Sequence, residues 1–324
     1  MPTNSLVSVI ISAYNHERYI QETIQSIIQQ TYQNIELIII DDGSQDKTWK
    51  KILEMEKVCQ QRFSRVVFQQ QENHGTCYSA NKLLNLANGE YVYFIASDDV
   101  AKPLAIEKEF NFLHNNPEYA LAVGDNELID SDSNVCFWDK KRNIVYDNKQ
   151  AKYKTFADFI KADTKVKFNS KEFGHYIKLI HENHVPNGYL VRKSIFEKIG
   201  YFTPKAPLED WWLMLQISKY AKMKYLNEIL FSYRWHNSNT IKHKEKIKQM
   251  MKQNILYENE ILENIDTSQV AEYSLKEILK IKKEGIVYKT FGIPNLITYE
   301  KSKKKNKKYR ILKIFNIVVR GWYK

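Results

Sequence analysis

Along the first hundred residues, apolar side chains follow two alternating spacings. Residues 6–12 and 35–40 are short apolar runs rich in branched aliphatic side chains, as in strands that are covered on both faces. Between them, residues 19–28 repeat apolar side chains at helical spacing. This order of elements predicts an α/β fold with a mainly parallel sheet. Its later elements are a helix near residues 49–58, a strand at 66–68, a helix at 78–87 and a strand at 91–96.

Beyond residue 99 the pattern is less regular. Residues 137–183 form a long polar stretch with only short helical patches. Two strands are still expected, at residues 120–123 and 225–235, and a helix at 209–221. The final predicted elements are charged amphipathic helices over residues 241–284.

Positive charge is concentrated at the C-terminal end of the chain. Of the net charge of +11, residues 299–324 contribute +9, from ten Lys or Arg and the single acid Glu300. An apolar stretch with Trp322 near its end follows the basic cluster, which is typical of an interfacial segment on an anionic membrane surface. The alternative is a solvated basic run before a docked terminal helix. A nucleic-acid-binding protein would more often spread basic residues over its fold, so we expect no nucleic-acid partner.

The cysteines and the apolar runs indicate the compartment. Cys59, Cys77 and Cys136 are odd in number and form no CxxC pair, which predicts reduced thiols in a cytosolic protein. No apolar run approaches the length of a membrane span, and the N-terminus has no secretory signal pattern. We therefore expect a cytoplasmic protein, peripheral at the inner face of the cell membrane through its basic tail.

Polar residues follow three of the predicted strands, at the ends where open α/β sheets bind ligands. These are residues 12–15, the pair Asp41 and Asp42, and residues 97–99. Neither GxGxxG nor GxxxxGK[ST] is present, so a diphosphate would need another partner, such as a divalent metal ion held by carboxylates. In the adjacent pair Asp98 and Asp99, one carboxylate can meet a ribose hydroxyl while the other coordinates that metal. The alternative is a solvated turn after a strand.

An ordered series of short motifs resembles the family 2 glycosyltransferases of the GT-A fold. The resemblance implies a Rossmann-like nucleotide-diphospho-sugar transferase fold. It also implies inverting transfer from a UDP-sugar to a glycan or lipid-linked acceptor, in the synthesis of a bacterial surface polysaccharide such as capsule or lipopolysaccharide. The motifs comprise residues 9–15, 30–32, 36–44, 73–75, 80–81, 87–92, 97–99, 190–193, 209–210 and 233–236.

The resemblance also implies a nucleotide-sugar site. Ser12 and Tyr14 would contact the base and ribose, with Ala13 between them and Glu17 close by. Asn81 belongs to the same predicted set.

The acidic residues of the motifs would bind the nucleotide and the metal. Asp42 would accept a hydrogen bond from the base edge, while Asp41 supports the turn. Asp98 would bind the ribose or diphosphate, and Asp99 would coordinate Mn²⁺ or Mg²⁺. Many family members have a further Asp at the position of Ala96, so this chain departs from the pattern there.

Two further residues are candidates for the chemistry. In the family, the Asp of the pair at Glu209 and Asp210 is the general base, and an acceptor hydroxyl needs such a base because it is a poor nucleophile until its proton is removed. The alternative is that the two acids only favour a helix start. His236 would approach the metal or the departing diphosphate, or else be a surface histidine at a loop start.

These expectations define a domain organisation and leave two competing functions. Residues 1–240 would form the GT-A catalytic domain, with a nucleotide-binding half (1–100) and an acceptor half (101–240). A helical extension (241–298) and a basic amphipathic tail (299–324) would follow. The competing functions are a nucleic-acid-binding protein acting through the tail, and a sugar nucleotidyltransferase. The second would need a glycine-rich loop bearing Arg or Lys after the first strand, which residues 12–18 do not supply.

Overall fold

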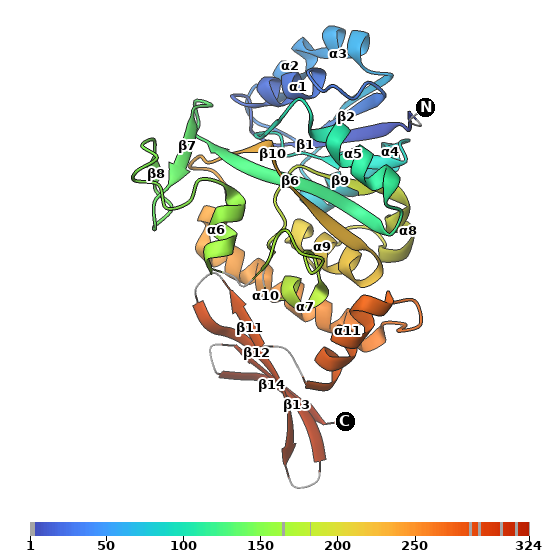
Figure 1. Ribbon diagram of the computed structural model, residues 1–324, viewed down its shortest axis with the longest axis vertical. Helices are drawn as coiled ribbons and strands as arrows, with labels where there is room; N and C mark the ends of the chain where they lie inside the picture. Colours follow the sequence, from blue (N-terminus) through green and yellow to red (C-terminus); the bar gives the residue numbers. More distant parts are fainter. Residues whose placement is uncertain are drawn as a thin grey trace.

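A ten-stranded sheet forms the centre of the protein, and a four-stranded sheet follows it near the C-terminus (Figure 1). The computed structural model describes residues 4–163, 166–181, 183–284, 287–290, 293–304, 307–314 and 317–323. The large sheet runs in the order β3-β2-β1-β4-β9-β6-β10-β5, and β7 and β8 extend it beside β6. Its strands are β1 (Val7–Ala13), β2 (Ile35–Asp41), β3 (Arg65–Gln70), β4 (Tyr91–Phe94), β5 (Val100–Ala101), β6 (Tyr119–Ile129), β7 (Val135–Trp138), β8 (Ile144–Val145), β9 (Tyr189–Arg192) and β10 (Lys222–Arg234).

The pairing of the strands confirms the expected α/β fold with a mostly parallel central sheet. β1 pairs in parallel with β2 and with β4, β2 with β3, and β10 with β6. β9 and β5 are antiparallel to their neighbours. β1 and β2 are almost wholly buried, because helices cover both faces of this part of the sheet.

Side chains of β1 alternate between two hydrophobic clusters, one on each face of the sheet. Val9 and Ile11 pack with Ile24 and Phe110, whereas Ile10 packs with Leu83. The first face is therefore covered by α1 and α5, and the second by α4. The helices of this half are α1 (Ile20–Ile28), α2 (Thr48–Glu54), α3 (Glu56–Arg62), α4 (Thr76–Leu86) and α5 (Ala105–Asn115).

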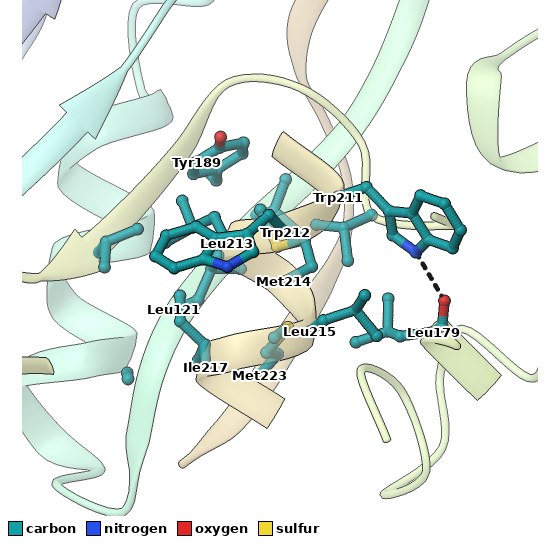
Figure 2. Packing of buried hydrophobic residues seen from close by; sticks show 14 of the residues in the cluster. Leu121, Leu179, Tyr189, Trp211, Trp212, Leu213, Met214, Leu215, Ile217 and Met223 are labelled. Atoms are coloured by element: carbon teal, nitrogen blue, oxygen red, sulfur yellow. Dashed lines mark hydrogen bonds between the residues drawn. The ribbon is translucent and has the colours of Figure 1, made fainter. Parts of the chain in front are cut away.

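Helix α9 (Glu209–Tyr220) is apolar on nearly all sides, because it is enclosed by other elements. Trp211 and Trp212 point to opposite sides of the helix, and the indole nitrogen of Trp211 donates to the carbonyl oxygen of Leu179 at 2.7 Å (Figure 2). This packing fixes the start of α9, where Glu209 and Asp210 lie. The surrounding short helices are α6 (Phe156–Asp163), α7 (Tyr176–Leu179), η1 (Lys193–Ile195), α8 (Phe196–Ile199) and η2 (Thr240–Lys242).

A buried ion pair joins α9 to α10 (Lys244–Asn264). The Lys219 Nζ lies 2.7 Å from the Glu258 Oε1, and neither side chain reaches solvent. Glu258 also accepts hydrogen bonds from Tyr176 and Gln216, so its carboxylate is fully paired. Breaking a buried ion pair leaves an uncompensated charge. This network therefore favours one position of α10 against α9.

The segment after residue 284 differs from the sequence expectation. The predicted helical extension over residues 241–298 contains α10 and α11 (Glu272–Glu284), but strands begin at residue 287. The basic tail (299–324), for which the sequence left an interfacial segment or a docked helix open, also contains strands. β-branched side chains such as Val287 and Ile293 favour strands. The antiparallel strands are β11 (Val287–Thr290), β12 (Ile293–Lys304), β13 (Lys307–Ile314) and β14 (Ile317–Tyr323).

Local patterns also missed part of the second half. The strand expected at residues 120–123 is the eleven-residue β6, and the polar stretch at 137–183 contains strand β8 and helices α6 and α7. No helix of the described residues is both long enough and apolar enough to span a membrane. The domain boundaries remain a prediction.

Candidate active site

The ends of β1, β2 and β4 bring the predicted site residues to one edge of the sheet. Ala13 at the end of β1 is in register with Asp41 at the end of β2, and the backbone nitrogen of Asp42 donates to the carbonyl oxygen of Ala13 at 2.8 Å. β4 lies on the other side of β1, and the turn carrying Asp98 and Asp99 follows it. This is the edge at which open α/β sheets bind ligands.

Three side chains at this edge form a candidate metal cluster. One possible ligand atom from each of His16, Asp98 and His236 lies within 4.8 Å of the others. The Asp98 Oδ2 is 2.8 Å from the His236 Nε2 and 3.8 Å from the His16 Nε2. A carboxylate oxygen with two imidazole nitrogens is a donor set that divalent metals accept, so these residues fit a metal ion.

The second nitrogen of each imidazole is held by a neighbouring hydroxyl. The His16 Nδ1 lies 2.7 Å from the Ser97 Oγ, and the His236 Nδ1 lies 2.8 Å from the Ser238 Oγ. The backbone nitrogen of His16 also donates to the Thr48 Oγ1 at 2.8 Å. Such contacts fix the ring orientation of metal-binding histidines. The sequence interpretation did not select His16, whose contacts to Ser97 and Asp98 join residues distant in the chain.

The two adjacent aspartates lie in different surroundings, and the roles expected of them stay predictions. Asp98, and not Asp99, shares the cluster with His236. The Asp99 Oδ1 accepts from the backbone nitrogen of Arg234 at 2.8 Å, and the Asp99 Oδ2 is buried without a hydrogen-bond partner. Burial and the neighbouring Asp98 raise the pKa of Asp99 well above its ordinary value. Adjacent side chains point in different directions, so only one of the pair can face the histidines.

A fully buried guanidinium holds the turn that carries these aspartates. The Arg234 Nε donates to the carbonyl oxygen of Asp98 at 2.6 Å, and its Nη2 donates to the Glu22 Oε2 at 2.6 Å. The Arg234 Nη1 donates to the Ser133 Oγ at 2.8 Å, and the guanidinium lies over the ring of Tyr19. Although residues 233–236 were recognised as a motif, no role was assigned to Arg234. A basic residue at the end of an apolar strand was the available signal.

Asp42 is buried and organises the turn before α4. Its Oδ1 accepts from the Gln71 Nε2 at 2.8 Å and from the backbone nitrogen of His74 at 3.0 Å. Its Oδ2 accepts from the backbone nitrogen of Gly75 at 2.9 Å. Burial raises the pKa of Asp42, but these hydrogen bonds outweigh burial and leave the pKa below its ordinary value. Asp41 holds its own turn by accepting from the Ser44 Oγ at 2.5 Å.

The other residues predicted to bind the nucleotide sugar differ in their exposure and in their hydrogen bonds to the protein. Ser12 is partly buried, Ala13 is fully buried, and the Tyr14 side chain is exposed beside them. Glu17 accepts a hydrogen bond from the backbone nitrogen of Lys47 at 2.7 Å. The Asn81 Nδ2 donates to the carbonyl oxygen of Phe202 at 2.8 Å, and the Asn81 Oδ1 accepts from the backbone nitrogen of Phe202 at 2.9 Å.

In this structure Asn81 therefore clamps the loop at Phe202, and Glu17 holds the turn at Lys47. Their expected contacts with a nucleotide sugar stay predictions, since both side chains already pair with the protein.

Two acids with raised pKa values open α9. The Asp210 Oδ2 accepts from the Asn183 Nδ2 at 3.0 Å, which orients the carboxylate. Burial raises the pKa of Asp210, and burial together with the charge of Asp210 raises the pKa of Glu209 to about 7. A carboxylate with a raised pKa is suited to accept a proton near neutral pH. The sequence interpretation did not identify Asn183.

Tyr233 is affected by acids from both parts of the candidate site. Burial raises the pKa of Tyr233, and the charges of Asp99, Asp98 and Asp210 raise it further. Tyr189 in β9 is similarly affected by burial and then by Asp210. The charge of Asp210 therefore acts on both tyrosines, and the charges of Asp98 and Asp99 act on Tyr233.

Comparisons with known proteins identify the family and the fold of this chain. A family model described as Glycosyl transferase family 2 matches residues 8–200. An uncharacterised glycosyltransferase of Haemophilus influenzae is 32% identical over 295 residues, covering 88% of this chain and 84% of that protein. S. aureus TarS in complex with UDP-GlcNAc aligns with a TM-score of 0.56 and 17% identity, over 84% of this chain and 70% of TarS. The mannosyltransferase PcManGT from Pyrobaculum calidifontis, in complex with GDP-Man and Mn²⁺, aligns with a TM-score of 0.55 and 13% identity, over 86% and 76%.

Proposed function

Because this chain belongs to glycosyl transferase family 2, we propose that it moves a sugar from a UDP-linked donor to an acceptor hydroxyl with inversion. We infer that the acceptor is a glycan or a lipid-linked sugar, in the synthesis of a bacterial surface polysaccharide. The observation that carries the proposal is the cluster of His16, Asp98 and His236, which lies where the turn after β4 meets the end of β10. A sugar nucleotidyltransferase is not favoured, since the loop after β1 has no glycine.

In this proposal Asp210 is the general base. It removes the proton of the acceptor hydroxyl as the acceptor oxygen attacks the anomeric carbon, and the bond from that carbon to the diphosphate oxygen breaks on the opposite face. Burial supports this role by raising the pKa of Asp210, and the hydrogen bond from Asn183 at 3.0 Å directs its carboxylate. The partly buried surroundings also limit competition from water for the donor.

The leaving diphosphate would lie at the cluster. A Mn²⁺ or Mg²⁺ ion bound by Asp98 and His236, with His16 beside them, would offset the negative charge of the diphosphate. Arg234 would stabilise this arrangement, because its side chain donates a hydrogen bond to the backbone of Asp98. Ser12, Ala13 and Tyr14 would face the nucleoside.

The proposal is tested by a screen of UDP- and GDP-linked sugars for Mn²⁺-dependent release of the nucleoside diphosphate. The same donors are then offered to the Asp210→Asn variant with acceptor sugars. We expect the variant to retain donor binding and to lose transfer by about 10²–10⁴-fold, because an amide cannot take the acceptor proton. Transfer at the wild-type rate would refute the assignment of Asp210, and the matched Glu209→Gln variant would then show whether its neighbour is the base.

We also propose that the basic C-terminal segment holds the enzyme at the inner face of the cell membrane. The net charge of +9 on residues 299–324 supports this, since each basic residue near an anionic surface contributes about 1 kcal/mol. The full-length protein should sediment with anionic vesicles at low salt and less so at high salt, because salt screens the attraction. Equal sedimentation with neutral vesicles would contradict the proposal.

A further inference from the structure

A pocket of about 540 Å³ opens beside the cluster, on the side where His236 forms part of its wall. Three cations from separate elements line it, namely Arg18 after β1, Arg142 between β7 and β8, and Lys242 in η2. Trp235 provides an apolar surface between them. Apart from His236, none of the residues assigned to the nucleotide or the metal from the sequence lines this pocket.

Among the residues that the structure describes, no carboxylate forms an ion pair with Arg142 or Lys242. The Lys242 Nζ lies 4.4 Å and the Arg142 Cζ 5.8 Å from the centroid of the Trp235 ring. Within the described part of the chain, Arg18 alone of the three cations forms an ion pair, with Asp132. A contact with an aromatic face stabilises a cation but leaves its charge uncompensated. Two like charges held over one indole therefore favour a ligand of negative charge.

The backbone at Arg142 is held in an unusual conformation by its own turn. Its φ angle of 65° lies in the left-handed region, which few arginines adopt. A turn built on Asp139 enforces this conformation, because the Asp139 Oδ1 accepts from the backbone nitrogens of Lys141 at 2.7 Å and Asn143 at 2.9 Å. The turn therefore fixes the backbone from which the Arg142 side chain reaches the pocket.

We propose that Arg142 and Lys242 form an anion subsite that takes a phosphate group of a ligand bound beside the cluster. A diphosphate carries two negative charges, one on each internal phosphate, and can balance both cations, whereas a single carboxylate would leave one unpaired. The guanidinium fork of Arg142 suits two phosphate oxygens, and the ammonium of Lys242 adds a point charge. The phosphate could belong to the donor diphosphate or to the acceptor. The identity of this ligand rests on the proposed function, whereas the anion subsite itself does not.

Calorimetry with inorganic pyrophosphate, in the presence of EDTA, tests the subsite without catalysis or metal. The full-length protein should bind pyrophosphate, and Arg142→Gln and Lys242→Gln should each weaken binding by about tenfold, since each removes a charge-assisted hydrogen bond. Lys141→Gln is the matched control, because Lys141 is exposed on the same turn and does not line the pocket. Absence of binding at millimolar pyrophosphate, or equal binding by all three variants, would overturn the proposal.

A second set of titrations identifies the source of the phosphate. If the donor supplies it, Arg142→Gln and Lys242→Gln lose affinity for UDP or GDP while their affinity for the free nucleoside is unchanged. If the acceptor supplies it, both variants bind the nucleoside diphosphates normally. Pyrophosphate then binds to the UDP-loaded wild type and more weakly to the loaded variants. Unchanged nucleoside affinity and thermal melts show that the variants are folded. Because no transfer is measured, failure of the proposed function would not alter these results.

Discussion

Glu209 provides a test of the electrostatics at the start of α9. Burial and the adjacent Asp210 raise its pKa from 4.5 to about 7. A carboxylate whose pKa is raised on folding stabilises the protein below the unfolded pKa, and this stability is lost as the pH rises through the folded pKa. Each pKa unit corresponds to about 1.4 kcal/mol, so ionisation of Glu209 destabilises the folded protein by about 3 kcal/mol above neutral pH. Glu209→Gln should remove this effect.

The Glu209→Gln variant also loses a stabilising interaction, which reduces its expected gain in the free energy of unfolding. A negative charge at a helix N-terminus is stabilising by about 0.3–1 kcal/mol, and Glu209→Gln loses it. The amide keeps an oxygen for the hydrogen bond from Thr76. The burial effect is larger, so we expect the variant to be more stable than wild type by about 2 kcal/mol at about pH 8. Near the unfolded pKa the two proteins should differ little.

Urea unfolding followed by tryptophan fluorescence measures this difference, at about pH 5 and about pH 8. Glu56→Gln serves as the control, because Glu56 also opens a helix but is exposed, and its variant should be no more stable than wild type. A Glu209→Gln variant that is less stable than wild type at the higher pH, or equally changed at both, would refute the reasoning. Such a result would mean that Glu209 is well solvated in the folded protein.

Three further predictions concern the rest of the site. Asp98→Ala and His236→Ala should each weaken Mn²⁺ binding at least about tenfold, as measured by EPR spectroscopy; unchanged binding would exclude the cluster. Asp42→Ala should reduce UDP affinity in calorimetry while retaining a cooperative thermal melt. Arg234→Met should lower the free energy of unfolding by about 3–5 kcal/mol, whereas Arg18→Met, at an exposed ion pair, should lower it by less than about 1 kcal/mol. Equal losses would contradict the role of burial.

The sequence was informative where structure depends on local spacing. The alternation over the first hundred residues predicted β1, β2, β3 and β4, because each contains an apolar run, and β1 and β2 are covered on both faces. The single helix expected near residues 49–58 is divided into α2 and α3. The strand ends also predicted where polar chemistry gathers, since parallel strands share one carboxyl edge. The spacing of residues along the chain was enough to predict both the strands and the edge where polar residues gather.

The sequence was uninformative where distant segments decide the outcome. β9 is inserted between β4 and β6, a sheet order that no local pattern encodes. Whether Asp98 or Asp99 faces the histidines depends on Arg234, which lies 136 positions from Asp98 and donates to its carbonyl oxygen. Asn183 is 27 positions from Asp210. Both contacts form only when segments distant in the chain have packed together.

The end of β10 links the candidate metal cluster to the anion subsite. Consecutive residues there serve different purposes: Arg234 fixes the turn of Asp98, Trp235 forms the apolar surface of the pocket, and His236 contacts the Asp98 carboxylate. A displacement of this strand end would therefore move the cluster and the pocket wall together. β10 is held by its parallel pairing with β6, so the position of both sites depends on a long-range strand pair. This coupling would hold the proposed phosphate subsite and the candidate metal cluster at a fixed separation, as a ligand with adjacent charged groups would require.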